Sequence, residues 1–259
     1  MPSPGSPGVW VTVVIPAYNE AQRLPLTLGA WFDFFAGQGY RAEVLVVDDG
    51  SRDATSDVVQ VFAREKAEER AQKGAGAGAP EIRLLTLVRN QGKGGAVRAG
   101  MLAAAGAYVF YVDADLNIGP EHITPALAYL STDYDVVAGQ RRLRDYASTE
   151  RSATRVLAGA LVQATRRVVV LPTIRDTQCG FKGFRAAMAR EIFRRARIRS
   201  FAFDVEVLFL ARRLGARIEE LPVEVTFRPG SSYDVRRHLL PFLGDILAIR
   251  RHALSGAYS

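Results

Sequence analysis

The sequence is poor in cysteine and in lysine, and it has no long apolar run. A single cysteine, Cys179, among 259 residues excludes an intrachain disulfide framework and fits a reducing compartment. The longest uncharged apolar stretch, AGMLAAAGAYVFYV, falls short of the ~20 residues that a membrane-spanning helix needs. The N-terminal MPSPGSPG has neither the basic nor the apolar region of a secretory signal. We therefore expect a chain that does not cross a membrane by itself.

The chain has a net positive charge, and nearly all of its positively charged side chains are arginines. The net charge is +7 and the isoelectric point about 9.8, and lysine occurs only at positions 66, 73, 93 and 182. Such a balance is typical of proteins that bind nucleic acid, an anionic membrane surface or phosphate-bearing substrates. The arginines are scattered, and aromatic residues do not interleave with them as in a known nucleic-acid-binding module. We expect no nucleic-acid partner, and a non-enzymatic nucleic-acid binder is the alternative that the charge suggests.

Continuous apolar, β-branched runs predict buried parallel strands in the first half of the chain. They lie at residues 9–16, 42–50, 81–88 and 106–115, and helical patterns separate them at about 20–35, 54–70 and 94–105. Runs without alternation indicate strands that are buried on both faces. Repeated alternation of strand and helix predicts an open α/β sheet with right-handed crossovers. Asp53 is a candidate N-cap for the second helix.

The second half of the chain is less regular. The patterns predict a fifth strand at 133–141, a helix at 150–167, a turn or hairpin at 176–185, an apolar helix at 203–215 closed by glycine, and a final strand at 218–227. The domain organisation that we expect is a flexible tail at residues 1–9, one large domain at 10–230, and a C-terminal basic amphipathic helical segment at 231–259.

Polar side chains follow three of the four predicted parallel strands. PAYNE, residues 16–20, follows the first strand, Asp48 and Asp49 end the second, and Asp113 and Asp115 end the fourth. Ligands bind outside the carboxyl ends of the strands in open α/β sheets, so these carboxylates should converge. Two close carboxylates repel unless a cation lies between them, and Mg²⁺ or Mn²⁺ takes one or two carboxylates together with water and phosphate oxygens. The D-x-D pattern therefore predicts a metal that holds a diphosphate, and the alternative is ordinary turn capping.

The Gly-rich stretch NQGKGGAVRAG, residues 90–100, opens the third predicted helix. It matches neither the P-loop nor the dinucleotide fingerprint that follows a first strand. Its glycines would permit a close backbone approach to a nucleotide, with Lys93 adding positive charge. A tight strand-to-helix turn is the alternative interpretation.

Several motifs together resemble those of one enzyme family. At their spacings, VVIPAYNE, VLVVDDGSRD, NQGKGGAVRAG and YVDADL resemble the family 2 glycosyltransferases, which have the GT-A fold, a Rossmann-like, mixed, mainly parallel sheet flanked by helices. DTQCGFKGFR, FAFDVEVLFLARRLG and GKGGAVR are similar to the dolichyl-phosphate β-glucosyltransferases and, more broadly, to the polyprenyl-phosphate glycosyltransferases. The resemblance covers about residues 10–230. It implies inverting transfer of a sugar from a nucleotide-diphosphate sugar, with UDP-glucose preferred, to dolichyl or polyprenyl phosphate, with Mg²⁺ or Mn²⁺ as cofactor.

The resemblance also implies roles for individual residues. The residues that would bind the nucleotide-sugar are Pro16, Tyr18, Glu20, Asp48, Asp49, Lys93 and Asp113. The residues that would hold the metal are Asp113, Asp115 and Asn117. The acceptor phosphate would be held by Arg141 together with Arg151 or Arg155, between which the sequence does not choose. The residues assigned to catalysis are Asp113, Asp115, Asp176 and Arg141.

Asp176 occupies the position at which many inverting relatives carry a carboxylate that faces the acceptor. A phosphate monoester has a second pKa near ~6, so it is largely dianionic at pH 7 and needs little help from a base. We therefore expect Asp176 to orient the acceptor or the sugar hydroxyls rather than to remove a proton. We expect Cys179 to be a packed turn residue, not a nucleophile.

The eukaryotic glucosyltransferases that the chain resembles usually carry an N-terminal membrane segment, and many bacterial relatives carry C-terminal ones. This sequence shows instead the C-terminal stretch DVRRHLLPFLGDILAIRRHALSGA. Its apolar residues are flanked by arginines at positions 236, 237, 250 and 251. This pattern is typical of a basic amphipathic helix on an anionic membrane surface, and the alternative is a helix packed on the core. We expect a cytoplasmic chain that is peripheral at the cytoplasmic face of a membrane.

Other enzymatic functions stay open at this point. One is transfer of mannose from GDP-mannose to polyprenyl phosphate, and another is the same fold acting on a soluble acceptor. A nucleotidyltransferase is disfavoured, because PAYNE stands where its Gly-rich loop would follow the first strand.

Overall fold

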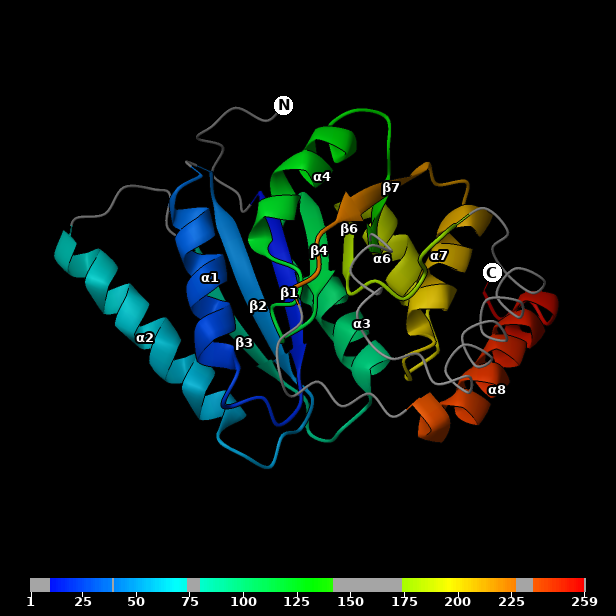
Figure 1. Cartoon of the computed structure of the whole chain (residues 1–259), viewed down its shortest axis with the longest axis horizontal. Coiled ribbons are helices and arrows are strands. Elements are labelled where there is room, and N and C mark those ends of the chain that lie inside the picture. The colour runs from blue at the N-terminus through cyan, green and yellow to red at the C-terminus, as the bar shows by residue number, and fades with distance from the viewer. Residues whose placement is uncertain (1–9, 39, 74–79, 142–173, 227–234, 259) are drawn as a thin grey trace.

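The structure is a computed structural model, and it describes residues 10–38, 40–73, 80–141, 174–226 and 235–258 (Figure 1). The predicted tail at 1–9, most of the Gly/Ala-rich connector after the second helix, and the predicted helix at 150–167 lie outside the described residues. Arg151 and Arg155, the two candidates for a second acceptor arginine, lie outside them as well.

The described strands form one mixed sheet in the order β3-β2-β1-β4-β6-β5-β7. Their bounds are Val11–Ala17 (β1), Ala42–Asp48 (β2), Glu81–Thr86 (β3), Tyr108–Val112 (β4), Val136–Arg141 (β5), Phe181–Arg185 (β6) and Ile218–Val223 (β7). Neighbouring strands pair in parallel, except that β6 is antiparallel to both β4 and β5. This confirms the prediction of a mixed, mainly parallel sheet.

Helices cover both faces of the sheet (Figure 1). One face carries α1 (Leu24–Ala36), α2 (Thr55–Lys73) and α4 (Ile123–Leu130), which the short helix η1 (Pro120–His122) precedes. The other carries α3 (Lys93–Ala103), α6 (Ala186–Arg195) and α7 (Phe203–Arg213), and α8 (Val235–Leu254) packs against α7. Neighbours along β1 belong to different cores, since Val13 is part of the core that contains Trp31 of α1 and Val14 is part of the core that contains Phe203 of α7. This double burial explains why the strand sequences are continuously apolar.

The segment predicted as a turn or hairpin is a turn followed by a central strand. Residues 174–180 lead into β6, which enters the sheet between β4 and β5. Gly183 allows this close pairing, because a Cβ there would lie 2.2 Å from Cε1 of Phe110 on β4. Since β6 is antiparallel, its amino-terminal end lies at the sheet edge where the other strands have their carboxyl ends.

Element boundaries differ from the sequence prediction in places. The first helix begins at Leu24 rather than near residue 20, because residues 18–23 form a loop, and the last strand ends at Val223 rather than 227. Asp53 lies one residue before the N-cap position of the second helix, which is Ala54, and its carboxylate accepts a hydrogen bond of 3.0 Å from the backbone N–H of Thr55, the first helical residue. α4 and α6 were not predicted from the sequence patterns.

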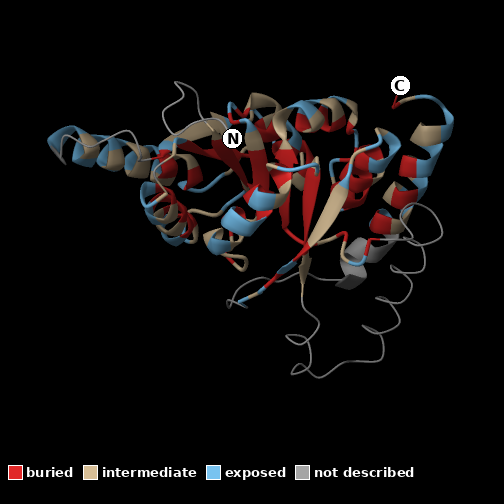
Figure 2. Ribbon diagram, turned by 90° about the horizontal axis from the view of Figure 1, so that it is seen from above, coloured by how far each residue is buried: buried red, intermediate tan, exposed pale blue. Residues whose placement is uncertain are grey.

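The C-terminal helix α8 is packed on the core and also has an exposed face. Phe242, Ile246 and Ile249 are buried in the core that α7 shares, and Leu247 and Leu254 are exposed. Figure 2 shows buried and exposed residues following one another along this helix near the C-terminus. Nowhere in the described ranges does a helix combine the length and the apolarity that crossing a bilayer would require.

Candidate active site

The polar segments predicted to converge lie at the carboxyl-terminal edge of the sheet. β1, β2 and β4 are adjacent strands, and Ala17 pairs with Asp48 at the ends of β1 and β2. The loops at 18–23, 49–54 and 113–119 therefore leave the sheet side by side. The turn before β6 reaches the same edge, because Phe181 pairs with Val112, the last residue of β4.

Hydrogen bonds from α1 and from Asn117 hold the D-x-D segment, residues 113–115, in place. On α1, the Thr27 hydroxyl donates a hydrogen bond of 2.6 Å to the carbonyl of Ala114, the residue between the two aspartates. The Asp115 carboxylate accepts a hydrogen bond of 3.0 Å from the backbone N–H of Asn117 and lies 2.5 Å from its side-chain amide nitrogen. Burial raises the pKa of Asp115 above its ordinary value, and the charge of Asp113 raises it further. The two carboxylates therefore repel each other, and the nearby charge of Lys93 offsets part of this repulsion.

Lys93, the first residue of α3, lies against this pair. Its Nζ is 2.5 Å from Oδ1 of Asp113, and the rings of Phe201 and Phe203 lie 5.7 and 5.9 Å from it. Burial alone would lower the pKa of Lys93, but the carboxylates of Asp113 and Asp204 outweigh burial, so the pKa is raised. Lys93 is thus a fixed positive charge beside the D-x-D segment.

The Asp48 and Asp49 carboxylates are largely occupied by the protein itself. Asp49 accepts hydrogen bonds of 2.7 and 2.9 Å from the backbone N–H groups of Gln91 and Gly92, and burial raises its pKa. Asp48 accepts from the backbone N–H of Ser51 at 2.9 Å and also from a serine hydroxyl on α2. Through these hydrogen bonds the two aspartates hold the loops around the predicted nucleotide site in place.

The loop after β1 carries the other predicted nucleotide-binding residues. Pro16 is half-buried in β1, and the Tyr18 ring is 41% exposed at the sheet edge. Glu20 forms an ion pair of 3.0 Å with Arg23. Burial raises the pKa of Glu20 against the lowering effect of Arg23, and Asp115 contributes to the rise, so Glu20 shares the electrostatic environment of the D-x-D segment.

Arg141 and Asp176 form a two-pronged ion pair at the end of β5. Arg141 Nε lies 2.7 Å from Oδ2 of Asp176 and Nη2 lies 2.9 Å from Oδ1, and the Arg141 backbone N–H also donates to Oδ2 at 3.2 Å. Burial alone would raise the pKa of Asp176, but the hydrogen bonds and charge of Arg141 outweigh burial and lower it. A carboxylate held ionised in this way is a weak base, in line with the expectation that Asp176 does not remove a proton.

The donor set at the D-x-D segment fits a hard divalent cation. The described residues contain no group of three or more His, Cys, Asp and Glu arranged to hold a metal, so the protein would supply the two aspartates and the Asn117 amide. Mg²⁺ and Mn²⁺ accept such a partial set and complete it with water and substrate phosphate. Gly180 leaves space for the carboxylate of Asp113, one of the candidate metal ligands, because a Cβ at position 180 would lie 2.1 Å from its Oδ2.

Three residues of this region were given no role by the sequence analysis. They are Gly180, Lys182 and Asp204, and the last two form a buried ion pair of 2.6 Å behind the D-x-D strand. Two of the three lie in the motif DTQCGFKGFR and the third in FAFDVEVLFLARRLG. Both motifs supported the family resemblance, but they gave no role to these individual residues. Cys179 is fully buried, and burial raises the pKa of its thiol to about 12, which agrees with a packed turn residue.

Comparison with known proteins identifies the family. The model of Glycosyl transferase family 2 matches residues 12–193, so the chain belongs to this family. A dolichyl-phosphate beta-glucosyltransferase of Drosophila melanogaster is 34% identical, covering 98% of this chain and 78% of the relative. Relatives of the same name from Homo sapiens and Saccharomyces cerevisiae are each 31% identical, covering 98% and 96% of this chain and 78% and 77% of their own lengths.

Solved structures with the same fold are more distant in sequence. Glucosyl-3-phosphoglycerate synthase from Mycobacterium tuberculosis in complex with Mn²⁺ and UDP-glucose superposes with a TM-score of 0.61 at 18% identity, covering 93% of this chain and 80% of the other. The complex of the same synthase with phosphoglyceric acid gives a TM-score of 0.63 at 18% identity, with coverages of 93% and 81%. At these identities the likeness concerns the fold, and it confirms the predicted GT-A fold.

Proposed function

We propose that this family 2 glycosyltransferase transfers glucose from UDP-glucose to dolichyl phosphate or another polyprenyl phosphate, with inversion at the anomeric carbon. The observation that carries the proposal is the similarity, at 31–34% identity over nearly the whole chain, to dolichyl-phosphate beta-glucosyltransferases from fly, human and yeast. The arrangement at the sheet edge supports it, since a candidate diphosphate site and a candidate phosphate site lie at the same edge, at the ends of β4 and β5, which β6 separates.

The donor side consists of the D-x-D segment and the loops around it. Asp113, Asp115 and Asn117 would hold a divalent cation, Mg²⁺ or Mn²⁺, which would neutralise the charge of the departing nucleoside diphosphate, an effect worth several kcal/mol. Lys93 lies 2.5 Å from Asp113 and would add a second positive charge beside the diphosphate. Pro16, Tyr18, Glu20 and the loops shaped by Asp48 and Asp49 would enclose the nucleoside.

The acceptor side is the Arg141–Asp176 pair. Arg141 would bind the acceptor phosphate because a guanidinium group is suited to phosphate oxygens, and the two hydrogen bonds to Asp176 would fix its orientation. The incoming phosphate oxygen forms a bond to the anomeric carbon as the bond from that carbon to the diphosphate breaks, and the electron pair leaves with UDP. The acceptor is already dianionic above its second pKa of ~6, so no residue has to remove a proton.

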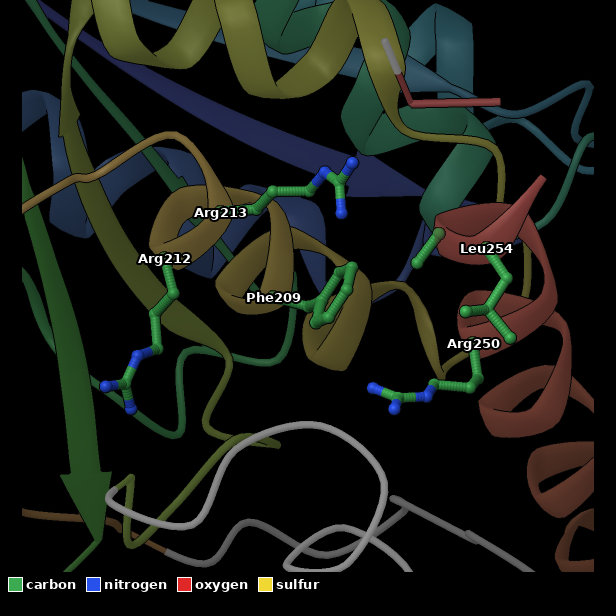
Figure 3. Close-up of a pocket in the computed structure, with 6 residues that line it drawn as sticks. Phe209, Arg212, Arg213, Arg250 and Leu254 are labelled. Carbon is green, nitrogen blue, oxygen red and sulfur yellow. The ribbon is translucent and has the colours of Figure 1, made fainter. Parts of the chain in front are cut away.

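We also propose that the chain binds an anionic membrane surface through the outer face of α8. Leu247 and Leu254 are 63% and 79% exposed, and they lie on one helical face with Arg250 and Arg251, which are also exposed. A pocket beside this face, lined by Phe209, Arg212, Arg213, Arg250, Ala253 and Leu254, combines apolar and cationic side chains (Figure 3). An acceptor with a polyprenyl tail is itself confined to a membrane.

The membrane proposal is tested by sedimentation with vesicles. Leu247→Gln/Leu254→Gln should reduce binding to vesicles that contain anionic lipid, because apolar area at the interface is lost. Leu26→Gln removes a leucine that is 59% exposed on α1, and it should bind as the wild-type chain does. Equal binding by all three proteins would exclude α8 as the contact.

The transferase proposal is tested with purified protein, UDP-glucose or GDP-mannose, Mg²⁺ or Mn²⁺, and a short polyprenyl phosphate. UDP release that depends on the lipid and is abolished by EDTA is the expected result. Lipid-dependent transfer from GDP-mannose would correct the sugar and keep the acceptor. Turnover with a soluble phosphate acceptor in place of the lipid would reject the lipid assignment.

A further inference from the structure

Lys182 is a fully buried lysine whose charge lies directly behind the candidate active site. Its Nζ is 2.6 Å from Oδ1 of Asp204 and donates a hydrogen bond of 2.7 Å to the carbonyl of Cys179. The Tyr111 hydroxyl donates to the same Asp204 oxygen at 2.6 Å, and the lysine Nζ lies 5.4 Å from the centre of the Tyr111 ring. Lys182 and Tyr111 are 0% exposed and Asp204 is 2% exposed, so the group forms a closed polar cluster within the apolar core.

Each member of this cluster is joined by one or two peptide units to a residue of the site. Tyr111 lies on β4, two residues before Asp113, and Asp204 follows Phe203, whose ring lies beside Lys93. The carbonyl that Lys182 binds belongs to Cys179, in the turn that runs from Asp176 to β6. The cluster therefore connects β4, which leads into the D-x-D segment, to the turn that carries Asp176.

The turn that Lys182 anchors also contacts the donor carboxylate directly. Gly180 lies so close to Asp113 that a Cβ would be 2.1 Å from its Oδ2. A shift of the turn would therefore move both the Arg141–Asp176 pair and the space in which Asp113 lies. The charge of Lys182 also reaches the acceptor side, where it helps to lower the pKa of Asp176.

A buried ion pair is a poor way to stabilise a core. Removing two charges from water costs several kcal/mol per ion, and replacing such a pair with apolar residues of similar volume is often neutral or stabilising. Breaking only one partner is costly, because an uncompensated charge stays buried. A buried lysine at the back of a reactive centre is thus better explained by the geometry that it imposes than by stability.

We propose that Lys182, through Asp204 and Tyr111, is a positioning residue that sets the spacing between the donor carboxylates, which follow β4, and Asp176 of the acceptor pair, which lies on the 176–180 turn. This inference rests on the proposed transferase function for its effect on turnover, whereas its effect on the turn is independent of that function. Lys182 touches neither substrate, and it acts through the Cys179 carbonyl and through the packing of Gly180 on Asp113.

The experiment compares Lys182→Met, Lys182→Met/Asp204→Leu and the matched control Lys66→Met. Lys66 lies on α2 and pairs with Glu69 on the surface, 3.1 Å away, so the control makes the same chemical change away from the site. For each protein, urea unfolding gives stability, steady-state kinetics give kcat and the acceptor KM, calorimetry gives the UDP affinity, and deuterium exchange reports on residues 174–181.

Lys182→Met should lose stability and kcat together, with kcat lower by about 10²-fold, the effect of misplacing reacting groups by about 1 Å. Adding Asp204→Leu should restore part of the stability, because no uncompensated charge is left buried although the Tyr111 hydroxyl loses its acceptor, but it should not restore kcat. Both variants should exchange deuterium faster at residues 174–181, should have a raised acceptor KM and, because the space around Asp113 changes, should bind UDP more weakly in the presence of Mn²⁺. Lys66→Met should match the wild-type chain in every readout.

A double variant that regains both stability and kcat would overturn the proposal, because the cluster would then be only structural. Lower kcat with unchanged exchange at residues 174–181 would overturn it as well. If Lys182→Met does not fold, Tyr111→Phe decides, since it removes one hydrogen bond and keeps the ion pair, and the proposal requires faster exchange in it. If the wild-type chain shows no lipid-dependent transfer, the transferase assignment fails, and the exchange measurement still decides the positioning role.

Discussion

Replacing Gly180 with alanine should damage catalysis much more than folding. The added Cβ would lie 2.1 Å from Oδ2 and 2.5 Å from Cγ of Asp113, whereas real Cβ atoms essentially never come closer than 3.0 Å to such atoms. The carboxylate must therefore move by about 0.9 Å, the difference between the observed and the allowed distance. A displacement of this size typically costs about 10²-fold in rate, or about 2.7 kcal/mol of transition-state stabilisation.

Two readouts and two control variants separate this effect from general damage. Gly180→Ala should lower kcat and weaken Mn²⁺ binding measured by titration. Gly29→Ala on α1, where nothing lies within 4 Å of the added Cβ, should leave both unchanged. Gly106→Ala should reduce stability alone, because its Cβ would lie 2.6 Å from the backbone nitrogen of Thr12 at the opposite sheet edge. Wild-type kcat and Mn²⁺ affinity in Gly180→Ala would refute the assignment of Asp113 as a ligand held by this turn.

Three further substitutions test the site. Asp115→Ala should abolish Mn²⁺-dependent transfer, with a loss of at least about 10²-fold in kcat, and normal activity would remove it from the metal site. Arg141→Lys should raise the acceptor KM by about tenfold with little change in UDP affinity, because lysine cannot make the two-pronged contact. Asp176→Asn should weaken the decrease in the free energy of unfolding at acid pH. The folded pKa of Asp176 is lowered, so the carboxylate stabilises the folded state above the unfolded pKa of ~3.9. This contribution is lost as the pH falls through the folded pKa. Parallel urea-unfolding profiles of variant and wild-type chains between neutral and acid pH would contradict this.

The part of the fold that sequence could predict is the part with a strong local signal. β1, β2 and β4 are continuous apolar runs, and their burial between two helical layers requires such runs. β6 could not be predicted in the same way, because FKGFR is short and contains a lysine and a glycine. Its place between β4 and β5 depends on the fit of Gly183 against the Phe110 ring, a contact between residues far apart in the sequence.

The site was predictable in its outline and not in its internal pairing. Carboxylates at the ends of parallel strands must share one sheet edge, so the placement of Asp49 and Asp113 followed from topology. That Asp49 binds the amides of Gln91 and Gly92 depends on loop geometry that no pattern encodes. Lys182 escaped attention because lysine is almost never fully buried unless it is paired, and its partner Asp204 lies 22 residues further along the chain.

The most direct test of the account is lipid-dependent release of UDP from UDP-glucose by the purified chain, with and without Mn²⁺. We expect release only when both the polyprenyl phosphate and the metal are present, together with formation of a β-linked glucosyl lipid. Metal-dependent release that is indifferent to the lipid, or the absence of turnover with any UDP- or GDP-sugar, would contradict it.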